Sequence, residues 1–244
     1  MIYLKSYCYN KHELAFVIAN LMEGYNFIDK LLLYEYNFTH TGIPKNYELE
    51  PLIKLIPEYL QSKLYYKKVD ITNYVEYAYE NGPLIHEINE PIQRSWAFND
   101  PNIKFNNDDI IIDIDIDEII YKSSYISLIK ELEEKNRPLS IRLNQFFYKN
   151  TYLWSNLNFA SPTIYKYNMT GNKIIKGLKI KNFRDVETKT TNIYGCHMSW
   201  VMPIDYMLKK LYSYGHPEYR HFCNKEILEK AVEEKKYIFD INKP

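Results

Sequence analysis

Residues 109–118 read Asp-Ile-Ile-Ile-Asp-Ile-Asp-Ile-Asp-Glu, and this stretch decides the fold class that we expect. Isoleucine occupies every even position from 110 to 116, and β-branched side chains in alternation favour a β-strand, here over 109–116. Such a strand would point Asp113, Asp115 and Asp117 to one face, with neighbouring carboxylates roughly 7 Å apart. The stretch therefore predicts a strand with an acidic face.

The segments before this strand alternate between two periodicities. Apolar runs predict strands at 2–9, 30–36 and 64–71, and helical patterns occur at 11–22, 49–60 and 72–98, the last broken at Gly82-Pro83 and near Pro91. Strands that alternate with helices indicate βαβ units and a mostly parallel sheet. Ligands of such sheets bind beyond the carboxyl ends of the strands, so residues 35–41 and 115–118 should lie at the same edge.

The pattern changes after residue 123. A short helix is expected at 124–135. Aromatic-rich extended segments follow at 141–154, 162–168 and 193–200, and two closing helices are expected at 204–212 and 225–235. No linker, repeat or low-complexity tract divides the chain. We expect one α/β domain over 1–244, with a Rossmann-like first half and a mixed, aromatic-rich second half.

Composition and charge exclude several classes of function. The 31 basic and 31 acidic residues cancel, so nothing in the net charge attracts nucleic acid. The three cysteines lack C-x-x-C spacing, which fits a reducing compartment. The sequence has no secretory signal pattern and no long apolar run, so we expect a soluble chain without a membrane span. We expect a cytoplasmic location, and the composition suggests a microbial or viral source.

The row of aspartates permits two interpretations. Carboxylates at this spacing repel one another unless a cation or solvent lies between them. Mg²⁺ or Mn²⁺ accepts one or two carboxylates and completes its coordination with diphosphate oxygens and water. The other interpretation is a half-exposed strand with an acidic solvent face, which a sheet covered on both faces would make less favourable.

Several sequence blocks resemble glycosyltransferase family 17. Residues 34–45, Tyr-Glu-Tyr-Asn-Phe-Thr-His-Thr-Gly-Ile-Pro-Lys, resemble the family's E-x-N-x-T-H-T-G-x-P-K signature. The other similar blocks are Gln93-Arg94, Asp115-Ile-Asp117-Glu118-Ile119, Gly195-Cys-His197-Met-Ser199-Trp200 and the ending from His216-Pro217-Glu218 to Phe239. Ile120 stands where the family motif has proline.

The resemblance implies a GT-A-like fold and an inverting transferase that uses a UDP-sugar, with N-acetylglucosamine as one possible sugar. It further implies Mn²⁺ or Mg²⁺ at the D-x-D-E motif. The acceptor would be a saccharide, such as a glycan or a lipid-linked or polysaccharide precursor. We expect residues 1–120 to bind the nucleotide sugar and residues 121–244 to bind the acceptor. The oligomeric state stays open.

The acidic motif and its neighbours receive these expected roles. Asp117 is the first choice for a direct metal ligand, and Asp115 binds the ribose or a metal-bound water. For Glu118, positioning of the donor sugar and acceptance of a backbone hydrogen bond are both open. His197 is expected to bind the metal or the diphosphate, although a buried core histidine is the alternative. Trp200 is expected more as a core residue than as a sugar platform.

The signature after the second strand offers groups suited to uridine or sugar hydroxyls, at Glu35, Asn37, Thr39, His40 and Thr41. A loop that bonds its own backbone is the alternative.

Two further residues are candidates for the reaction. Arg94 suits a phosphate or an ion pair. Asp205 is the candidate general base, with a helix-dipole role as its alternative.

Two other functions compete with the transferase. Clustered aspartates also serve metal-dependent phosphohydrolases and nucleases, although hydrolysis of a nucleic acid would favour a basic groove. A catalytically inert sugar-binding protein on the same fold is the third interpretation.

Overall fold

The computed structural model describes residues 1–81, 84–154, 159–169, 171, 173–181, 186–213 and 217–237. The predicted break at Gly82-Pro83, and His216 and Phe239 of the C-terminal motif, lie outside these residues.

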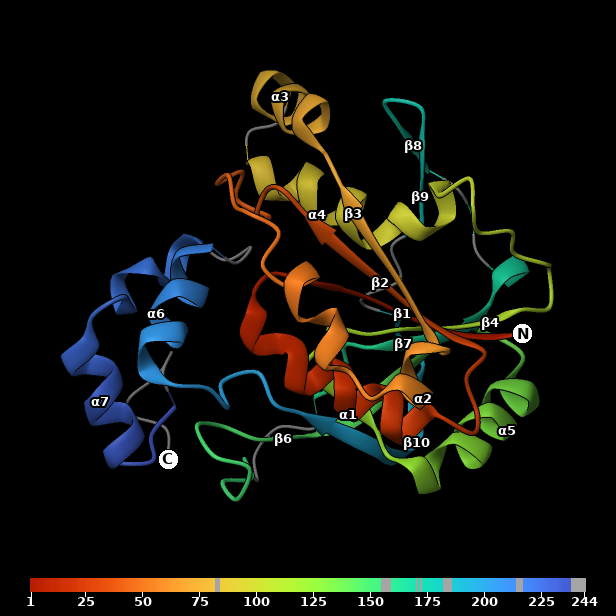
Figure 1. Ribbon diagram of the computed structural model, residues 1–244. Helices are drawn as coiled ribbons and strands as arrows, with labels where there is room; N and C mark the ends of the chain where they lie inside the picture. The colour runs from red at the N-terminus through yellow and green to blue at the C-terminus, as the bar shows by residue number, and fades with distance from the viewer. Residues whose placement is uncertain are drawn as a thin grey trace.

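One eight-stranded sheet forms the centre of the molecule (Figure 1). Its strands are β1 (Ile2–Cys8), β2 (Lys30–Tyr36), β3 (Leu64–Val69), β4 (Ile110–Asp113), β5 (Glu118–Ile120), β6 (Leu139–Gln145), β7 (Thr163–Lys166) and β10 (Lys189–His197). Their order is β3-β2-β1-β4-β7-β6-β10-β5. The first four are mutually parallel, whereas β7 is antiparallel to both of its neighbours and β5 is antiparallel to β10. The expected α/β class, parallel in the first half and mixed in the second, is confirmed.

Helices cover both faces of this sheet. The helices are α1 (Leu14–Gly24), α2 (Glu58–Gln61), α3 (Thr72–Asn81), α4 (Ile85–Ser95), α5 (Tyr125–Lys135), α6 (Ile204–Ser213) and α7 (Lys225–Glu233), with short 3-10 turns between several of them. One core joins α1, α2 and α5 to one face, and a second core joins α3 and the 3-10 turn Trp96–Asn99 to the other. Within β4, Ile110 and Ile112 belong to the first core and Ile111 to the second. Burial on both faces explains the unbroken isoleucine run.

Two expected elements end differently. The predicted 49–60 helix is split into a 3-10 turn, Glu50–Leu55, and α2. Ile56 is extended because Pro57 follows it, and the residue before a proline disfavours the helical conformation. Conversely, Pro91 lies inside α4 without ending it, where the fully buried Ile92 packs against Leu178 and Ile180.

The α6–α7 segment has its own core beside the sheet. Trp200, Met207, Leu211 and Leu228 are buried there, and both helices lie at the left of Figure 1. A hairpin of β8 (Lys173–Ile175) and β9 (Leu178–Ile180) forms a separate two-stranded sheet.

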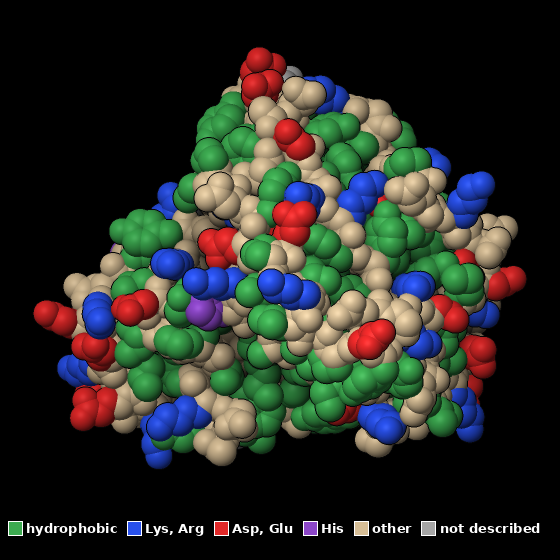
Figure 2. Space-filling model, viewed as in Figure 1, with side chains coloured by type: hydrophobic (Ala, Val, Ile, Leu, Met, Phe, Trp, Pro, Cys, Tyr) green, Lys and Arg blue, Asp and Glu red, His purple; other side chains and the backbone are tan. Residues whose placement is uncertain are grey.

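Charged side chains of both signs are interspersed over the face of the molecule that Figure 2 shows. None of the helices in the described ranges is long and apolar enough to cross a membrane.

Candidate active site

A cavity of about 830 Å³ opens at the carboxyl edge of the sheet. Its walls include residues that follow β1, β2, β4, β6 and β10, together with side chains of α4 and α6. The strand order reverses between β1 and β4, because β2 and β3 lie on one side of β1 and β4 on the other. Ligands of open α/β sheets bind at such a switch point, so the cavity occupies the expected place.

The acidic stretch is a strand followed by a tight turn, which corrects the predicted strand over 109–116. β4 ends at Asp113, which is buried and pairs with Lys5 at 2.8 Å between Oδ2 and Nζ. The next residues turn: the Glu118 N–H donates to the Asp115 carbonyl at 2.9 Å. Ile114 and Ile116 are buried by this turn rather than by a continued strand. Asp113 therefore lies in the core, and Asp115 and Asp117 project into the cavity.

Asp115 is held by two donors. Its Oδ1 accepts from the Tyr7 hydroxyl at 2.6 Å and from Arg94 Nη1 at 2.7 Å. Arg94, which is 5% exposed, also bonds Glu90 through Nε at 2.7 Å. Burial raises the pKa of Glu90, but nearby His40 and Arg94 outweigh it and lower that pKa to about 2. Two carboxylates and one guanidinium thus form an ionised network on one wall.

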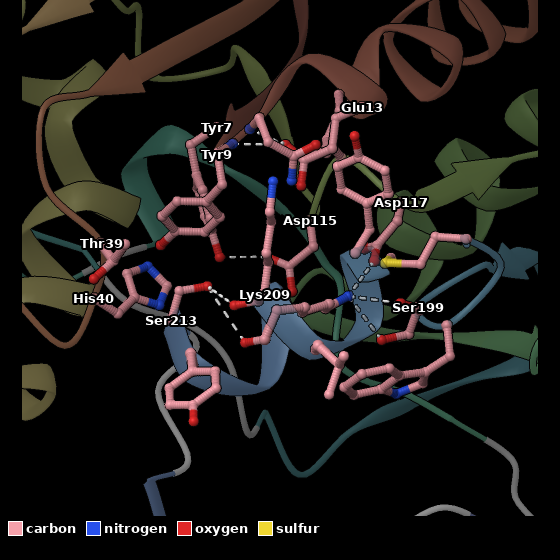
Figure 3. Close-up of a pocket in the computed structure, with 18 of the residues that line it drawn as sticks. Tyr7, Tyr9, Glu13, Thr39, His40, Asp115, Asp117, Ser199, Lys209 and Ser213 are labelled. Carbon is pink, nitrogen blue, oxygen red and sulfur yellow. Dashed lines mark hydrogen bonds and ion pairs between the residues drawn. The ribbon is translucent and has the colours of Figure 1, made fainter. Parts of the chain in front are cut away.

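Asp117 faces a second set of cations. Its Oδ2 accepts from Lys210 Nζ at 2.9 Å, and its Oδ1 lies 3.6 Å from His197 Nε2. Burial alone would raise the pKa of Asp117, but Lys210 and His197 hold it below its usual range. The Lys210 ammonium also donates to the Ser199 carbonyl and hydroxyl, at 2.7 and 3.0 Å. Asp115, Asp117 and Ser199 are seen around the same space in Figure 3.

Of the five candidate residues in the signature after β2, Thr39 and His40 line the cavity (Figure 3). The His40 Nδ1 lies 3.8 Å from Glu90 Oε2, and the rings of Tyr7 and Tyr9 lie 5.4 and 5.1 Å from the imidazole centre. Thr39 and His40 thus lie in the same cavity as Asp115 and Asp117, as expected for segments 35–41 and 115–118 at one edge of the sheet.

Three other residues of the signature do not line the cavity. Glu35 is fully buried, and its carboxylate accepts from the N–H groups of residues 48 and 49 and from the Tyr66 hydroxyl. Asn37 bonds Asp70, Thr72 and the Ile71 N–H. Thr41 shares a hydrogen bond with Thr39 at 3.2 Å. Thr41 also donates to the Ser213 carbonyl at 3.4 Å. These three side chains therefore bond mainly neighbouring segments rather than their own backbone, and they fix the loop that carries His40 to those segments.

Asp205 and Glu118, which the sequence predicts as the catalytic residues (Asp205 as general base, Glu118 as the residue that positions the donor sugar), both lie outside the cavity wall. Glu118 is fully buried, and its Oε2 accepts from the Asp115 N–H at 2.6 Å, which fixes the acidic turn. Asp205 stands in the first turn of α6 with its side chain 72% exposed, 3.4 Å from Lys225. Glu118 thus accepts a backbone hydrogen bond, which is one of the two roles expected for it. Asp205 stands where a carboxylate interacts favourably with the helix dipole, which is the alternative to its role as general base.

The sequence does not predict several of the polar residues that line the cavity, among them Tyr7, Glu13, Glu90 and Lys210. Glu13 has a visible signal, because Asn10-x-x-Glu13 is a capping box, and the carboxylate accepts from the Tyr9 N–H at 2.6 Å. Burial raises the pKa of Glu13 to about 7. Glu90 lies four residues before Arg94, the helical spacing of an ion pair. Nothing in the local sequence singles out Tyr7 or Lys210.

The donor set of the cavity fits a divalent metal that arrives with a diphosphate. Among the described residues, no three carboxylate, histidine or cysteine side chains form a ready metal cluster. Asp115 and Asp117 nevertheless line one cavity with His197, whose buried Nδ1 has no hydrogen-bond partner within the part of the chain that the structure describes. Mg²⁺ and Mn²⁺ are commonly held by one or two carboxylates, with phosphate oxygens completing the coordination.

The model of glycosyltransferase family 17 matches residues 9–242, and the chain belongs to that family. This membership decides against the phosphohydrolase and nuclease interpretations. A crystal structure of S. aureus TarS, residues 1–349, is similar over 95% of this chain and 72% of that chain, at 12% identity and a TM-score of 0.42. No curated protein matches the chain.

Proposed function

We propose that this glycosyltransferase moves a sugar from a UDP-sugar to a saccharide acceptor, with inversion at the anomeric carbon. One observation carries the proposal: Asp115 and Asp117 of the family motif line a cavity at the switch point of the sheet. A cavity of about 830 Å³ lies within the range of sites for nucleotide-sized ligands.

The donor's nucleoside would lie against the wall that follows β1 and β2. Tyr9 and His40 supply ring faces there, and Thr39 supplies a hydroxyl. The donor's diphosphate would then lie toward Arg94 and Asp117, where the cations of the cavity gather. Positive groups suit a diphosphate because they offset its charge at short range.

Asp117 would hold Mn²⁺ or Mg²⁺, with Asp115 and His197 as its further donors. When bound, the metal supplies positive charge that stabilises the departing nucleoside diphosphate. Asp115 is already oriented for this role, because Tyr7 and Arg94 fix its Oδ1.

The acceptor would enter from the side of α6 and α7. Trp200, Tyr206, Tyr219 and Tyr237 line that part of the cavity. Aromatic rings offer apolar faces on which sugar rings pack, while their polar atoms keep hydrogen-bonding ability. This placement supports a saccharide acceptor.

The proposal is tested by calorimetric titration with a panel of nucleotide sugars, with and without Mn²⁺. Asp117→Asn is compared with Asp108→Asn, which removes the same charge from an exposed position. We expect metal-dependent binding of a UDP-sugar by the unchanged chain and by Asp108→Asn, and loss of that binding in Asp117→Asn. Failure of the folded chain to bind any nucleotide sugar contradicts the proposal.

A further inference from the structure

Lys210 reaches the cavity from a distant part of the chain. It lies on α6, 93 residues after Asp117, and its ammonium makes three contacts of 3.0 Å or less, with Asp117 and Ser199. The side chain is 25% exposed, so the ammonium lies at the cavity surface and not in the core. Lys210 is therefore positioned to meet a ligand.

The neighbouring Lys209 gives an internal comparison. It also lines the cavity, but its ammonium lies over the Tyr206 ring at 5.0 Å. Lys210 is the lysine of this pair that forms an ion pair with a motif carboxylate. The two cavity aspartates thus each have their own cation, Arg94 from α4 for Asp115 and Lys210 from α6 for Asp117.

The two cations differ in how firmly they are held. Arg94 is 5% exposed and bonds Glu90 and Asp115 through separate nitrogens. Lys210 carries a compact charge on a flexible stem, and besides Asp117 its ammonium contacts two oxygens of Ser199 and lies 5.2 Å from the centre of the Trp200 ring. A divalent metal at Asp117 would compete with this ammonium for the same carboxylate, because both occupy the Oδ lone pairs.

We propose that Lys210 is the diphosphate-binding cation of the transferase and exchanges partners when the donor binds. In the free chain its ammonium neutralises Asp117. In the loaded chain Asp117 binds the metal, and the ammonium donates to a diphosphate oxygen instead. This inference rests on the proposed function and adds a catalytic residue to it.

The transfer step shows why the exchange is useful. The bond from the anomeric carbon to the diphosphate oxygen breaks, and both electrons stay on that oxygen. The acceptor hydroxyl oxygen forms the new bond and gives its proton to a base or to water. The departing diphosphate therefore gains one negative charge, which Lys210 stabilises without a change of protonation.

The first measurement needs no nucleotide. Mn²⁺ is titrated into the unchanged chain, Lys210→Gln and Lys230→Gln by calorimetry. Lys230→Gln removes the same charge from α7, where the side chain is 72% exposed. We expect Mn²⁺ to bind several-fold more tightly to Lys210→Gln, because the competing ammonium is gone. Equal affinity in all three chains would overturn the exchange.

The second measurement compares UDP with uridine at saturating Mn²⁺. We expect Lys210→Gln to lose about 10- to 100-fold in UDP affinity and to keep its uridine affinity, because only UDP has the diphosphate. Lys210→Arg should recover much of the loss, and Lys230→Gln should bind as the unchanged chain does. An unchanged UDP affinity in Lys210→Gln sinks the inference but leaves the proposed function standing, whereas no UDP binding by the unchanged chain removes both.

A pair of variants keeps the test decisive if Lys210→Gln does not fold. Asp117→Asn frees the ammonium, and Asp117→Asn with Lys210→Gln removes both charges of the ion pair together. Measured without metal, the remaining preference for UDP over uridine should be larger in the single variant than in the double variant. Equal preferences in the two would contradict a diphosphate contact from Lys210.

Discussion

A buried ion pair under the active site offers a quantitative test of the structure. Lys5 and Asp113 are register partners on β1 and β4, and they are 2% and 1% exposed. Their charged atoms are 2.8 Å apart, and Lys5 also donates to the Arg94 carbonyl. Removal of one partner leaves the other charge buried without compensation, which typically costs about 3–5 kcal/mol.

We therefore expect Lys5→Met and Asp113→Leu each to lower the free energy of unfolding by about 3–5 kcal/mol. For a chain of this length, that loss corresponds to a drop of about 10 °C in melting temperature. The double variant should be more stable than either single variant, because an apolar pair of similar volume replaces two desolvated charges. The Arg94 carbonyl loses its donor in the double variant, so full recovery is not expected.

The assay is urea unfolding followed by circular dichroism, with the free energies combined in a double-mutant cycle. The exposed pair Lys130–Glu134, whose side chains are 74% and 63% exposed, serves as the control. Its cycle should give a coupling below about 1 kcal/mol. Single variants at Lys5 and Asp113 that lose less than about 1 kcal/mol, or a double variant that loses the sum of both, would refute the reasoning.

Three further outcomes are expected. Gly195→Ala should unfold the β10–β5 edge, because a Cβ there would lie 2.0 Å from the Ile119 carbonyl oxygen; Gly171→Ala, with open space around it, is the thermal-shift control. Tyr7→Phe should weaken metal-dependent UDP binding by about tenfold or less in calorimetry, because Asp115 loses one neutral hydrogen bond. The folded pKa of Glu13 is raised to about 7, so the folded chain binds more protons and this residue lowers stability as pH rises from about 4.5 to 7. Glu13→Gln should flatten that part of the stability–pH curve in urea unfolding, and an unchanged slope would contradict the burial of Glu13.

The sheet was predictable because its strands carry strong local signals. β2 and α5 fall within one residue of their expected bounds, since apolar periodicity and Asn136-Arg137-Pro138 mark them in the sequence. The end of β4 was not predictable from alternation. Asp113 and Ile114 continue the pattern, but the turn is fixed by Glu118 and by partners on β1, which only the folded chain brings near.

Most of the predicted site residues that line the cavity lie at the carboxyl end of a strand, and Arg94 on α4 is the exception. Asp115, Asp117 and His40 lie just beyond such an end, and His197 is the last residue of β10. Glu35 and Asn37 share that position, but their side chains bond the loop, which sequence spacing does not reveal. Lys210 was invisible for another reason: its partner is 93 residues away, and nothing in α6 marks one lysine over the next.

The 93 residues between Asp117 and Lys210 set an order of events during synthesis of the chain. The ribosome makes the acidic turn well before α6, so Asp117 spends part of the chain's elongation without the ammonium that neutralises it. A nascent chain that ends before α6 has the sheet edge and the aspartates but lacks Lys210 and the aromatic wall of α6 and α7. Such a chain lacks one of the two cations that pair with the cavity aspartates. The completed enzyme appears only when its last helices have docked.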